Sequence, residues 1–322
     1  MVEISIMIEG QNGLNWPYWK RMAVEVDQLG FAGLFRSDHY TNPNPPDLDS
    51  LEMIVSLTYL ADRTQHIHFG PLVAPVSFRE PTMLARQAAA LDDLSNGRMI
   101  LGLGAGWQER EHSLFGYQLG NVKTRMDRFE EALEVITRLL RSDEPVTFEG
   151  HFFQVRGATL LPRTQRPGGP RIMIGGNGIK RTLPLVARYA DIWNTVAPTP
   201  ADFKERSQIL DRLLQQAGRQ PDAVKRTVMH SVVFARDRAE LEHKLSQYRQ
   251  EPEFTTMNTD GLVKQLIAAN KTIIGTPDQI VQQLQAYADA GAQEIMLQWF
   301  DFEDIEGLRA FASSVLPRVS TL

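Results

Sequence analysis

The chain has 322 residues, which is enough for one large α/β barrel or for two domains of medium size. Its hydrophobic (43%) and charged (23%) contents are those of an ordinary soluble globular protein, and its net charge of −5 argues against nucleic acid as the main partner. The complete absence of cysteine excludes disulfides, cysteine-bound metals and a thiol nucleophile.

The N-terminal segment MVEISIMIEG enters directly into an alternating, strand-like pattern. It has neither the basic nor the apolar region of a signal peptide, and no apolar run in the chain approaches the roughly 20 residues of a membrane span. We therefore expect a soluble, cytoplasmic protein that does not bind membranes.

Short apolar segments alternate with longer helical segments along the whole chain, a rhythm typical of a parallel sheet. The expected strands are 3–9, 33–37, 67–73, 99–103, 171–174, 191–196, 227–234 and 294–298. The expected helices are 17–29, 49–61, 81–94, 126–140, 180–189, 201–217 and 277–290. This order favours a single α/β domain over residues 1–322, a (β/α)₈ TIM barrel, with a Rossmann-like sheet as the alternative.

Two segments interrupt this rhythm. Residues 145–161 contain VTFEG and HFFQV and predict a hairpin, and residues 236–273 form a long polar excursion after the seventh expected strand. We expect both insertions at the C-terminal face of the barrel, where such segments often become lids over an active site.

The second expected strand ends in RSDHY, which places Asp38 and His39 at the mouth of a barrel. Adjacent residues of an extended chain point in opposite directions, so the two side chains need not form a pair. One can hydrogen-bond a ligand while the other acts as an acid or base. The alternative is a helix cap beside a surface histidine.

Two glycine-rich stretches follow later strands. In LGLGAGWQEREH (101–112) alternate glycines allow a ligand close to the backbone, Trp107 offers a face for stacking, and Glu109 and Glu111 offer carboxylates. Alternatively, Trp107 is a core residue at the rim of the barrel and the two glutamates are solvated. The spacing of the glycines does not fit the fingerprint of a dinucleotide-binding site. The stretch IMIGGNGIKRT (172–182) leads into a helix with Lys180 and Arg181, an arrangement that suits the binding of a phosphate. The alternative is that the glycines are needed only for the sterics of a tight turn.

The histidines do not predict a metal site. His66 and His68 form an H-x-H pair, but they lie at the start of the third expected strand, at the bottom of a barrel. No G-x-S-x-G motif is present either, so neither a metal hydrolase nor a serine hydrolase is favoured.

Taken together, these stretches resemble the luciferase-like monooxygenase superfamily, particularly its deazaflavin-dependent oxidoreductases. The matching motifs run in the family's order and cover nearly the whole chain. They are SDHY (37–40), FREPTMLARQAAALDDLSNGR (78–98), LGLGAGWQEREH (101–112), RMDRFEEALEVI (125–136), IGGNGIKRTLPLVARYADIWN (174–194) and IGTPDQI (274–280). The resemblance implies a bacterial luciferase-like TIM barrel with the cofactor ring over its C-terminal mouth, and a homodimer.

The resemblance also implies roles for individual residues. His39 looks like the residue used for proton transfer, Asp38 like the acidic contact to the ring edge, and Glu109 like a substrate-side carboxylate; Glu9 is a weaker candidate for the pocket. A bulge behind the ring, which in the family often holds a non-proline cis peptide, aligns with Leu72 and Val73. The remaining cofactor-binding candidates are Gly104, Ala105, Gly106 and Trp107 at the pyrimidine end, Gly175, Gly176, Asn177 and Gly178 in a phosphate loop, and Trp193 and Asn194.

The branch implies coenzyme F420 as the cofactor. A deazaflavin carries hydride and does not readily form the peroxide that a monooxygenase needs, so we expect hydride exchange with an alcohol, carbonyl, imine or activated alkene. The alternative is FMN, which would make the protein a two-component monooxygenase supplied by a partner flavin reductase. A non-catalytic flavin-binding barrel is a further alternative.

Overall fold

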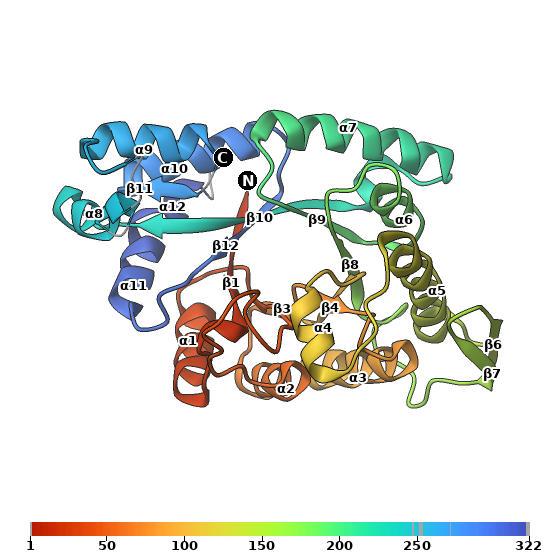
Figure 1. The fold of residues 1–322 in the computed structure, drawn as a ribbon. Helices are drawn as coiled ribbons and strands as arrows, with labels where there is room; N and C mark the ends of the chain where they lie inside the picture. The colour runs from red at the N-terminus through yellow and green to blue at the C-terminus, as the bar shows by residue number, and fades with distance from the viewer. Residues whose placement is uncertain (1, 247, 251–253, 271, 320–322) are drawn as a thin grey trace.

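The computed structural model describes residues 2–246, 248–250, 254–270 and 272–319, and within them every strand expected from the sequence is present. Figure 1 shows these strands as an inner ring with helices around it. The ring is formed by β1 (Glu3–Ile8), β2 (Gly33–Arg36), β3 (His68–Pro71), β5 (Ile100–Gly104), β8 (Arg171–Gly175), β9 (Ile192–Val196), β10 (Lys225–Phe234) and β12 (Glu294–Gln298).

The parallel sheet closes on itself, which confirms the (β/α)₈ barrel and excludes an open Rossmann-like sheet. Its strand order is β3-β2-β1-β12-β10-β9-β8-β5-β4, where β4 (Ala74–Pro75) continues β3 after an interruption. Beyond that interruption Ala74 pairs with Leu103, and before it a parallel bridge joins Phe69 to Met99. The third barrel strand therefore connects to its neighbours on both sides.

Both faces of the sheet are covered, so the strands are nearly continuous apolar runs. One core cluster fills the layer between the strands and the helices. Side chains that alternate with it along the strands form a second, inner cluster that fills the barrel beneath its mouth. This inner cluster consists of Met7, Phe35, Leu72, Ile100, Met173, Ile192, Met229 and Met296.

The outer layer contains each helix expected from the sequence and several shorter ones. Prolines at the first helical turn and capping side chains at Asn15, Glu80 and Thr199 start three of the long helices. The helices are α1 (Trp16–Gln28), α2 (Met53–Arg63), α3 (Pro81–Leu94), α4 (Glu109–Phe115), α5 (Val122–Arg141), α6 (Thr182–Tyr189), α7 (Pro200–Gln216), α8 (Arg238–Leu245), α9 (Thr259–Ala268), α10 (Pro277–Asp289), α11 (Ile305–Ser314) and α12 (Leu316–Val319). Among the described residues no helix combines the length and apolar character needed to cross a bilayer.

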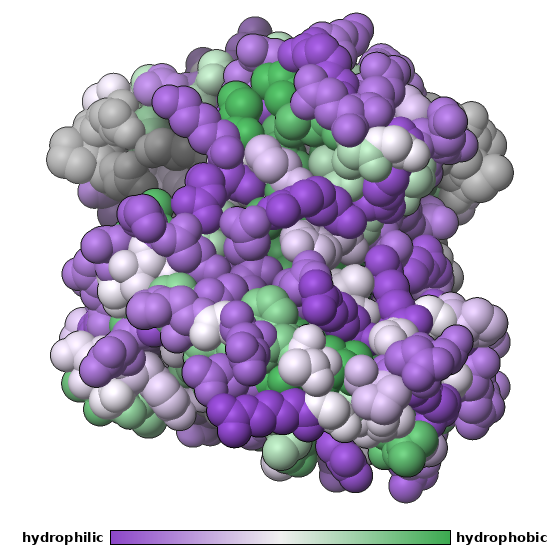
Figure 2. All heavy atoms as spheres, turned by 90° about the vertical axis from the view of Figure 1, so that its right-hand side faces the viewer, coloured by the Kyte–Doolittle hydropathy of each residue, from purple (hydrophilic) through white to green (hydrophobic). Residues whose placement is uncertain are grey.

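Residues 145–161 form the expected hairpin, β6 (Val146–Glu149) with β7 (Gln154–Ala158), but its expected place at the C-terminal face was wrong. The hairpin leaves the end of α5 and leads into the start of β8, so it belongs to the opposite side of the barrel. It packs outside α5, where Glu131 accepts the backbone N–H groups of His151 and Phe152. Figure 1 shows it at the edge of the molecule, and Figure 2 shows that this side of the protein is largely hydrophilic.

Residues 236–273 start at the C-terminal end of β10, as expected. They contain α8 and α9 and return as β11 (Ile273–Gly275), whose Ile273 pairs in parallel with Val232 of β10. Residues 247, 251–253 and 271 of this insertion lie outside the described residues. The described part has its own apolar core, formed by Ala235, Leu241, Leu245, Phe254, Leu262, Val263, Leu266 and Ile274.

Candidate active site

The C-terminal ends of the barrel strands surround a cavity of about 510 Å³. A barrel concentrates function at this end because the loops after its strands converge over the axis. Neither insertion lines the cavity, so the expected lids are absent from its described wall. The candidates from the sequence that do line it are His39, Leu72, Val73, Gly104, Ala105, Gly106, Trp107, Glu111, Gly175, Gly176, Asn194 and the weaker candidate Glu9.

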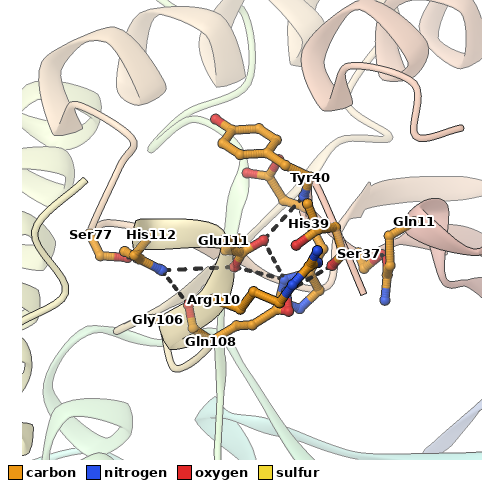
Figure 3. Close-up of polar contacts among 12 residues, drawn as sticks. Gln11, Ser37, His39, Tyr40, Ser77, Gly106, Gln108, Arg110, Glu111 and His112 are labelled. Atoms are coloured by element: carbon orange, nitrogen blue, oxygen red, sulfur yellow. Dashed lines mark hydrogen bonds and ion pairs between the residues drawn. The ribbon is translucent and has the colours of Figure 1, made fainter. Parts of the chain in front are cut away.

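His39 is held by a buried carboxylate. Its Nδ1 lies 3.0 Å from Oε1 and 3.1 Å from Oε2 of Glu111, which is 1% exposed and also accepts the backbone N–H of Tyr40 (Figure 3). Burial disfavours the charged imidazolium, but the hydrogen bond and charge of Glu111 outweigh it and raise the pKa of His39 above its ordinary 6.5. With Nδ1–H donated to the carboxylate, the neutral ring has its lone pair on Nε2. His39 is thus arranged to exchange a proton at Nε2.

The loop before α4 determines where Glu111 lies. Gly106 has a φ of +83°, and a Cβ at this position would meet the Ser77 Oγ at 2.2 Å, so the loop requires glycine here. The two ring nitrogens of His112 lie 2.7 Å from the Ser77 Oγ and 2.7 Å from the Gln108 carbonyl oxygen. Figure 3 shows Ser77 and His112 on one side of Glu111 and His39 on the other. The contacts of His112 thus hold the first turn of α4 with Glu111 beside His39.

Glu109 was expected as the substrate-side carboxylate, and the structure corrects this expectation. It is exposed at the start of α4, where it lines a shallow adjoining pocket that shares Pro43, Trp107 and Gln108 with the main cavity, but it does not line the main cavity itself. Residues two apart on an α-helix lie about 200° apart around its axis, so Glu109 and Glu111 cannot share one face. Glu111 is the carboxylate of α4 that lines the cavity.

Asp38 does not line the cavity either, which corrects its expected contact with the cofactor ring. It is 3% exposed and receives two hydrogen bonds from Arg79, at 2.8 Å from Nε and 2.7 Å from Nη2. Arg79 is also paired with Glu52 of the segment before α2, at 2.8 Å. Because His39 takes the inward direction at the end of β2, its neighbour is directed away from the mouth. Asp38 therefore anchors the loop after β4.

The bulge between β3 and β4 forms one wall of the cavity. The Leu72–Val73 peptide is cis, in agreement with what the family resemblance implies at this position. Val73 lies against two glycines: a Cβ at Gly104 would come within 2.6 Å of its Cγ2, and a Cβ at Gly175 within 3.0 Å of its Cγ1. Glycine at both positions keeps room for the Val73 side chain beside the cavity.

A polar chain that the sequence analysis largely missed runs along the ends of β1, β2 and β12. Glu9 accepts hydrogen bonds from the side-chain amides of Gln298 at 2.6 Å and Gln11 at 3.0 Å. Gln11 in turn accepts the Ser37 hydroxyl at 2.7 Å, and Ser37 accepts the backbone N–H of Gly10 at 2.8 Å. The one sequence signal that could have identified these residues as part of the site is their position at the ends of strands, because glutamine and serine belong to no recognisable motif here.

Only part of the expected phosphate loop lines the cavity. Gly176 lines the cavity, but Asn177 and Gly178 are exposed outside it. The Asn177 side chain joins the ends of β8 and β9, because it accepts the Thr195 hydroxyl at 2.6 Å and donates to the Val196 carbonyl at 2.9 Å. The described contacts of Asn177 thus shape the loop, and its contact with a cofactor phosphate stays a prediction.

Trp193 is likewise corrected from a cavity residue to a core residue. It is fully buried, with its ring stacked on Phe203 of α7 at a centroid distance of 5.7 Å. Its indole N–H donates to the Gly176 carbonyl at 3.0 Å, so it supports the loop from behind. Its neighbour Asn194 does reach the cavity and donates to the Thr227 hydroxyl at 2.9 Å.

Comparisons with known proteins agree with this architecture. The F420-dependent glucose-6-phosphate dehydrogenase of Amycolatopsis mediterranei (strain U-32) is 25% identical over 93% of this chain and 93% of its own length. The 4-hydroxyprotoasukamycin monooxygenase of Streptomyces nodosus subsp. asukaensis is 26% identical over 92% of this chain and 85% of its own. A solved F420-dependent secondary alcohol dehydrogenase, in complex with an F420–acetone adduct, has the same fold, with a TM-score of 0.81 at 18% identity over 99% of each chain.

The match at the level of the family is more specific. The model of the luciferase-like monooxygenase family matches residues 2–294, a range that includes the barrel strands from β1 to β10 and every described cavity-lining residue except Gln298. The chain therefore belongs to the luciferase-like monooxygenase family.

Proposed function

We propose that this protein is an F420-dependent oxidoreductase that transfers a hydride between the deazaflavin and a small organic substrate, either an alcohol or carbonyl, an imine or an activated alkene. The observation that carries the proposal is the His39–Glu111 pair on the cavity wall, with Nε2 of His39 left for a substrate. The names of several relatives, which are F420-dependent dehydrogenases, support the cofactor.

The residues present fit a flat, tricyclic ring. The cavity has a largely apolar wall at Leu72, Val73 and Met229, and Gly104 carries no side chain that would displace Val73 from this wall. Gln108 also lines the cavity, and its buried Oε1 has no hydrogen-bond partner among the described residues. A ring with apolar faces and an N–H donor at its edge would satisfy both features.

When bound, F420 supplies the carbon that accepts or donates the hydride. In the oxidative direction an alcohol loses its C–H hydrogen with the bonding electron pair, and its O–H proton passes to Nε2 of neutral His39. The imidazolium that results is balanced by Glu111, at 3.0 Å from Nδ1. In the reductive direction protonated His39 returns the proton to the developing alkoxide, so the same residue serves as base and acid.

An FMN-dependent monooxygenase is the second candidate, because the Streptomyces relative at 26% identity is named as a monooxygenase. That chemistry would need oxygen and a partner reductase. Anaerobic turnover separates the two functions, because hydride exchange between F420 and an alcohol or carbonyl proceeds without oxygen. We expect the oxidised deazaflavin to lose its visible absorbance in the presence of an alcohol and no oxygen. Oxygen-dependent product formation with reduced FMN alone would contradict the proposal.

We also propose a homodimer, as the family resemblance implies. Analytical ultracentrifugation tests this assembly: a single species at twice the chain mass is expected, and a stable monomer would contradict it.

A further inference from the structure

The charge of the cavity wall is unbalanced. Glu9 and Glu111 both line it, whereas among the residues that the structure describes no lysine or arginine side chain does. On the described wall His39 is the one group that becomes cationic, when it is protonated, and it is then paired with Glu111. From this we infer that the cavity selects neutral or cationic substrates and excludes phosphorylated and carboxylated ones, so this chain does not share the sugar-phosphate substrate in the names of several relatives. The inference rests on the proposed function and names the substrate class of the same site.

Among the described residues, the arginines behind the mouth are paired or turned away from the cavity. Arg36 is buried behind Ser37, where it donates to the Ser37 carbonyl and the Ser56 hydroxyl. Arg79 is bound by Asp38 at 2.7 Å, and Arg110 is bound by Asp47 at 2.6 Å. Arg125 donates to the Gly106 carbonyl at 3.4 Å, from outside the loop that forms the wall. None of these guanidinium groups faces the cavity, so none is placed to bind the phosphate or carboxylate of a substrate there.

The cations farther out do not supply this charge either. Arg181 is bound by Asp127 at 2.8 Å, and Lys244 by Asp304 at 2.8 Å. Lys180 is exposed beyond the glycine-rich loop after β8, off the cavity wall. This position suits the phosphate of a cofactor tail that leaves the mouth and not a substrate inside it.

The carboxylate of Glu9 makes the charge of the cavity wall negative where a substrate would bind. Its two oxygens accept one hydrogen bond each from Gln298 and Gln11, which leaves further acceptor positions on the carboxylate. A hydroxyl or ammonium group can donate to them, whereas an anion would be repelled by this carboxylate, with which, among the described residues, only the buried Arg36 behind the wall is seen to interact as a cation. The half-exposed Trp107 offers an aromatic face at the rim, which suits an apolar or cationic molecule.

Probes of one shape and different charge test the inference without turnover. The cofactor-free protein is titrated by calorimetry with benzyl alcohol, benzylamine, benzoate and benzyl phosphate at fixed salt. We expect the alcohol and the amine to bind at least about tenfold more tightly than either anion, because the carboxylates of the cavity wall repel an anion. Equal or tighter binding of an anion, or binding of none of the four probes, would overturn the inference.

Two variants identify the source of the selectivity. Glu9→Gln removes one charge at constant size, so benzoate should bind about tenfold more tightly than to the wild type while benzyl alcohol changes little. Glu109→Gln removes an exposed carboxylate that lies off the cavity and should leave all four affinities unchanged. Unchanged discrimination in Glu9→Gln would contradict the role of Glu9. A parallel F420 titration keeps the two claims apart: charge selectivity without F420 binding would refute the proposed function alone.

Discussion

Glu111 of α4 holds Nδ1 of His39 at 3.0 Å, although the two residues lie 72 positions apart in the chain. The carboxylate is almost fully buried and accepts a backbone N–H of the β2 loop as well, so its position is fixed from two sides. This contact determines which ring nitrogen of His39 carries a proton and which one is left for the cavity. The proposed chemistry depends on that division.

Replacement of His39 tests its role as the acid or base. His39→Ala should lower the rate of hydride transfer by about a hundredfold or more, because a positioned general acid or base contributes on that scale. The affinity for F420 should change little, since the apolar and glycine walls remain. Single-turnover rates and cofactor titrations measure the two effects separately, and intact turnover would remove His39 from the mechanism.

The pH profile tests the coupling between His39 and Glu111. Burial lowers the pKa of His39 and Glu111 raises it to a greater extent, so the net pKa is above 6.5 in the wild type. Reduction requires protonated His39, so its rate should fall as pH rises through this raised pKa. In Glu111→Gln the carboxylate that raises the pKa of His39 is lost, and burial becomes the main influence on that pKa. The decline of the reduction rate should therefore occur at lower pH. Glu109→Gln is the matched control and should keep the wild-type profile, and an unmoved profile in Glu111→Gln would contradict the coupling.

The Asp38–Arg79 pair should be a major contributor to stability. Arg79→Met would leave the Asp38 carboxylate buried without its partner and should lower the free energy of unfolding by about 3 kcal/mol. Arg238→Met removes an arginine from the exposed pair with Asp260, where both charges stay hydrated, and should cost much less stability. Urea denaturation of both variants provides the comparison. Similar losses in the two would show that Asp38 is not held as the structure indicates.

The space beside Val73 should control cofactor affinity. A methyl group at Gly104 would come within 2.6 Å of the Val73 Cγ2, so Gly104→Ala should displace this side chain into the cavity. We expect about a tenfold loss of F420 affinity, from the lost fit of a ring against this wall. Gly218→Ala alters a glycine at the end of α7, away from the cavity, and controls for general destabilisation. Equal cofactor affinity in both variants would argue against the ring lying at this wall.

The strands and the mouth of the barrel could be predicted because their signals are local. Buried parallel strands are short apolar runs between helices, and His39 was recognised because RSDHY ends such a run. Which of Asp38 and His39 faces the cavity depends on how β2 is rotated within the closed ring. The rotation of β2 is set by its pairing with β1 and β3, and this pairing cannot be inferred from the sequence of β2 alone.

The role of α4 could not be predicted for a related reason. The helix is short and polar, with Glu109 and Glu111 close to its start, so either carboxylate could have faced the mouth. The choice is made by His112 through its contact with the Ser77 hydroxyl, 35 residues away in the chain. The hairpin at 145–161 was likewise recognised locally, but its place on the outside of α5 follows from its position before β8 in the barrel order.

Cofactor preference is the most direct test of the central claim. Purified, cofactor-free protein would be titrated at fixed salt with coenzyme F420 and separately with FMN, with fluorescence quenching as the readout. We predict tight binding of F420 and weak binding of FMN, as a hydride-transfer enzyme of this family requires. Tight binding of FMN with weak binding of F420 would contradict the account, make oxygen the co-substrate and require a partner reductase.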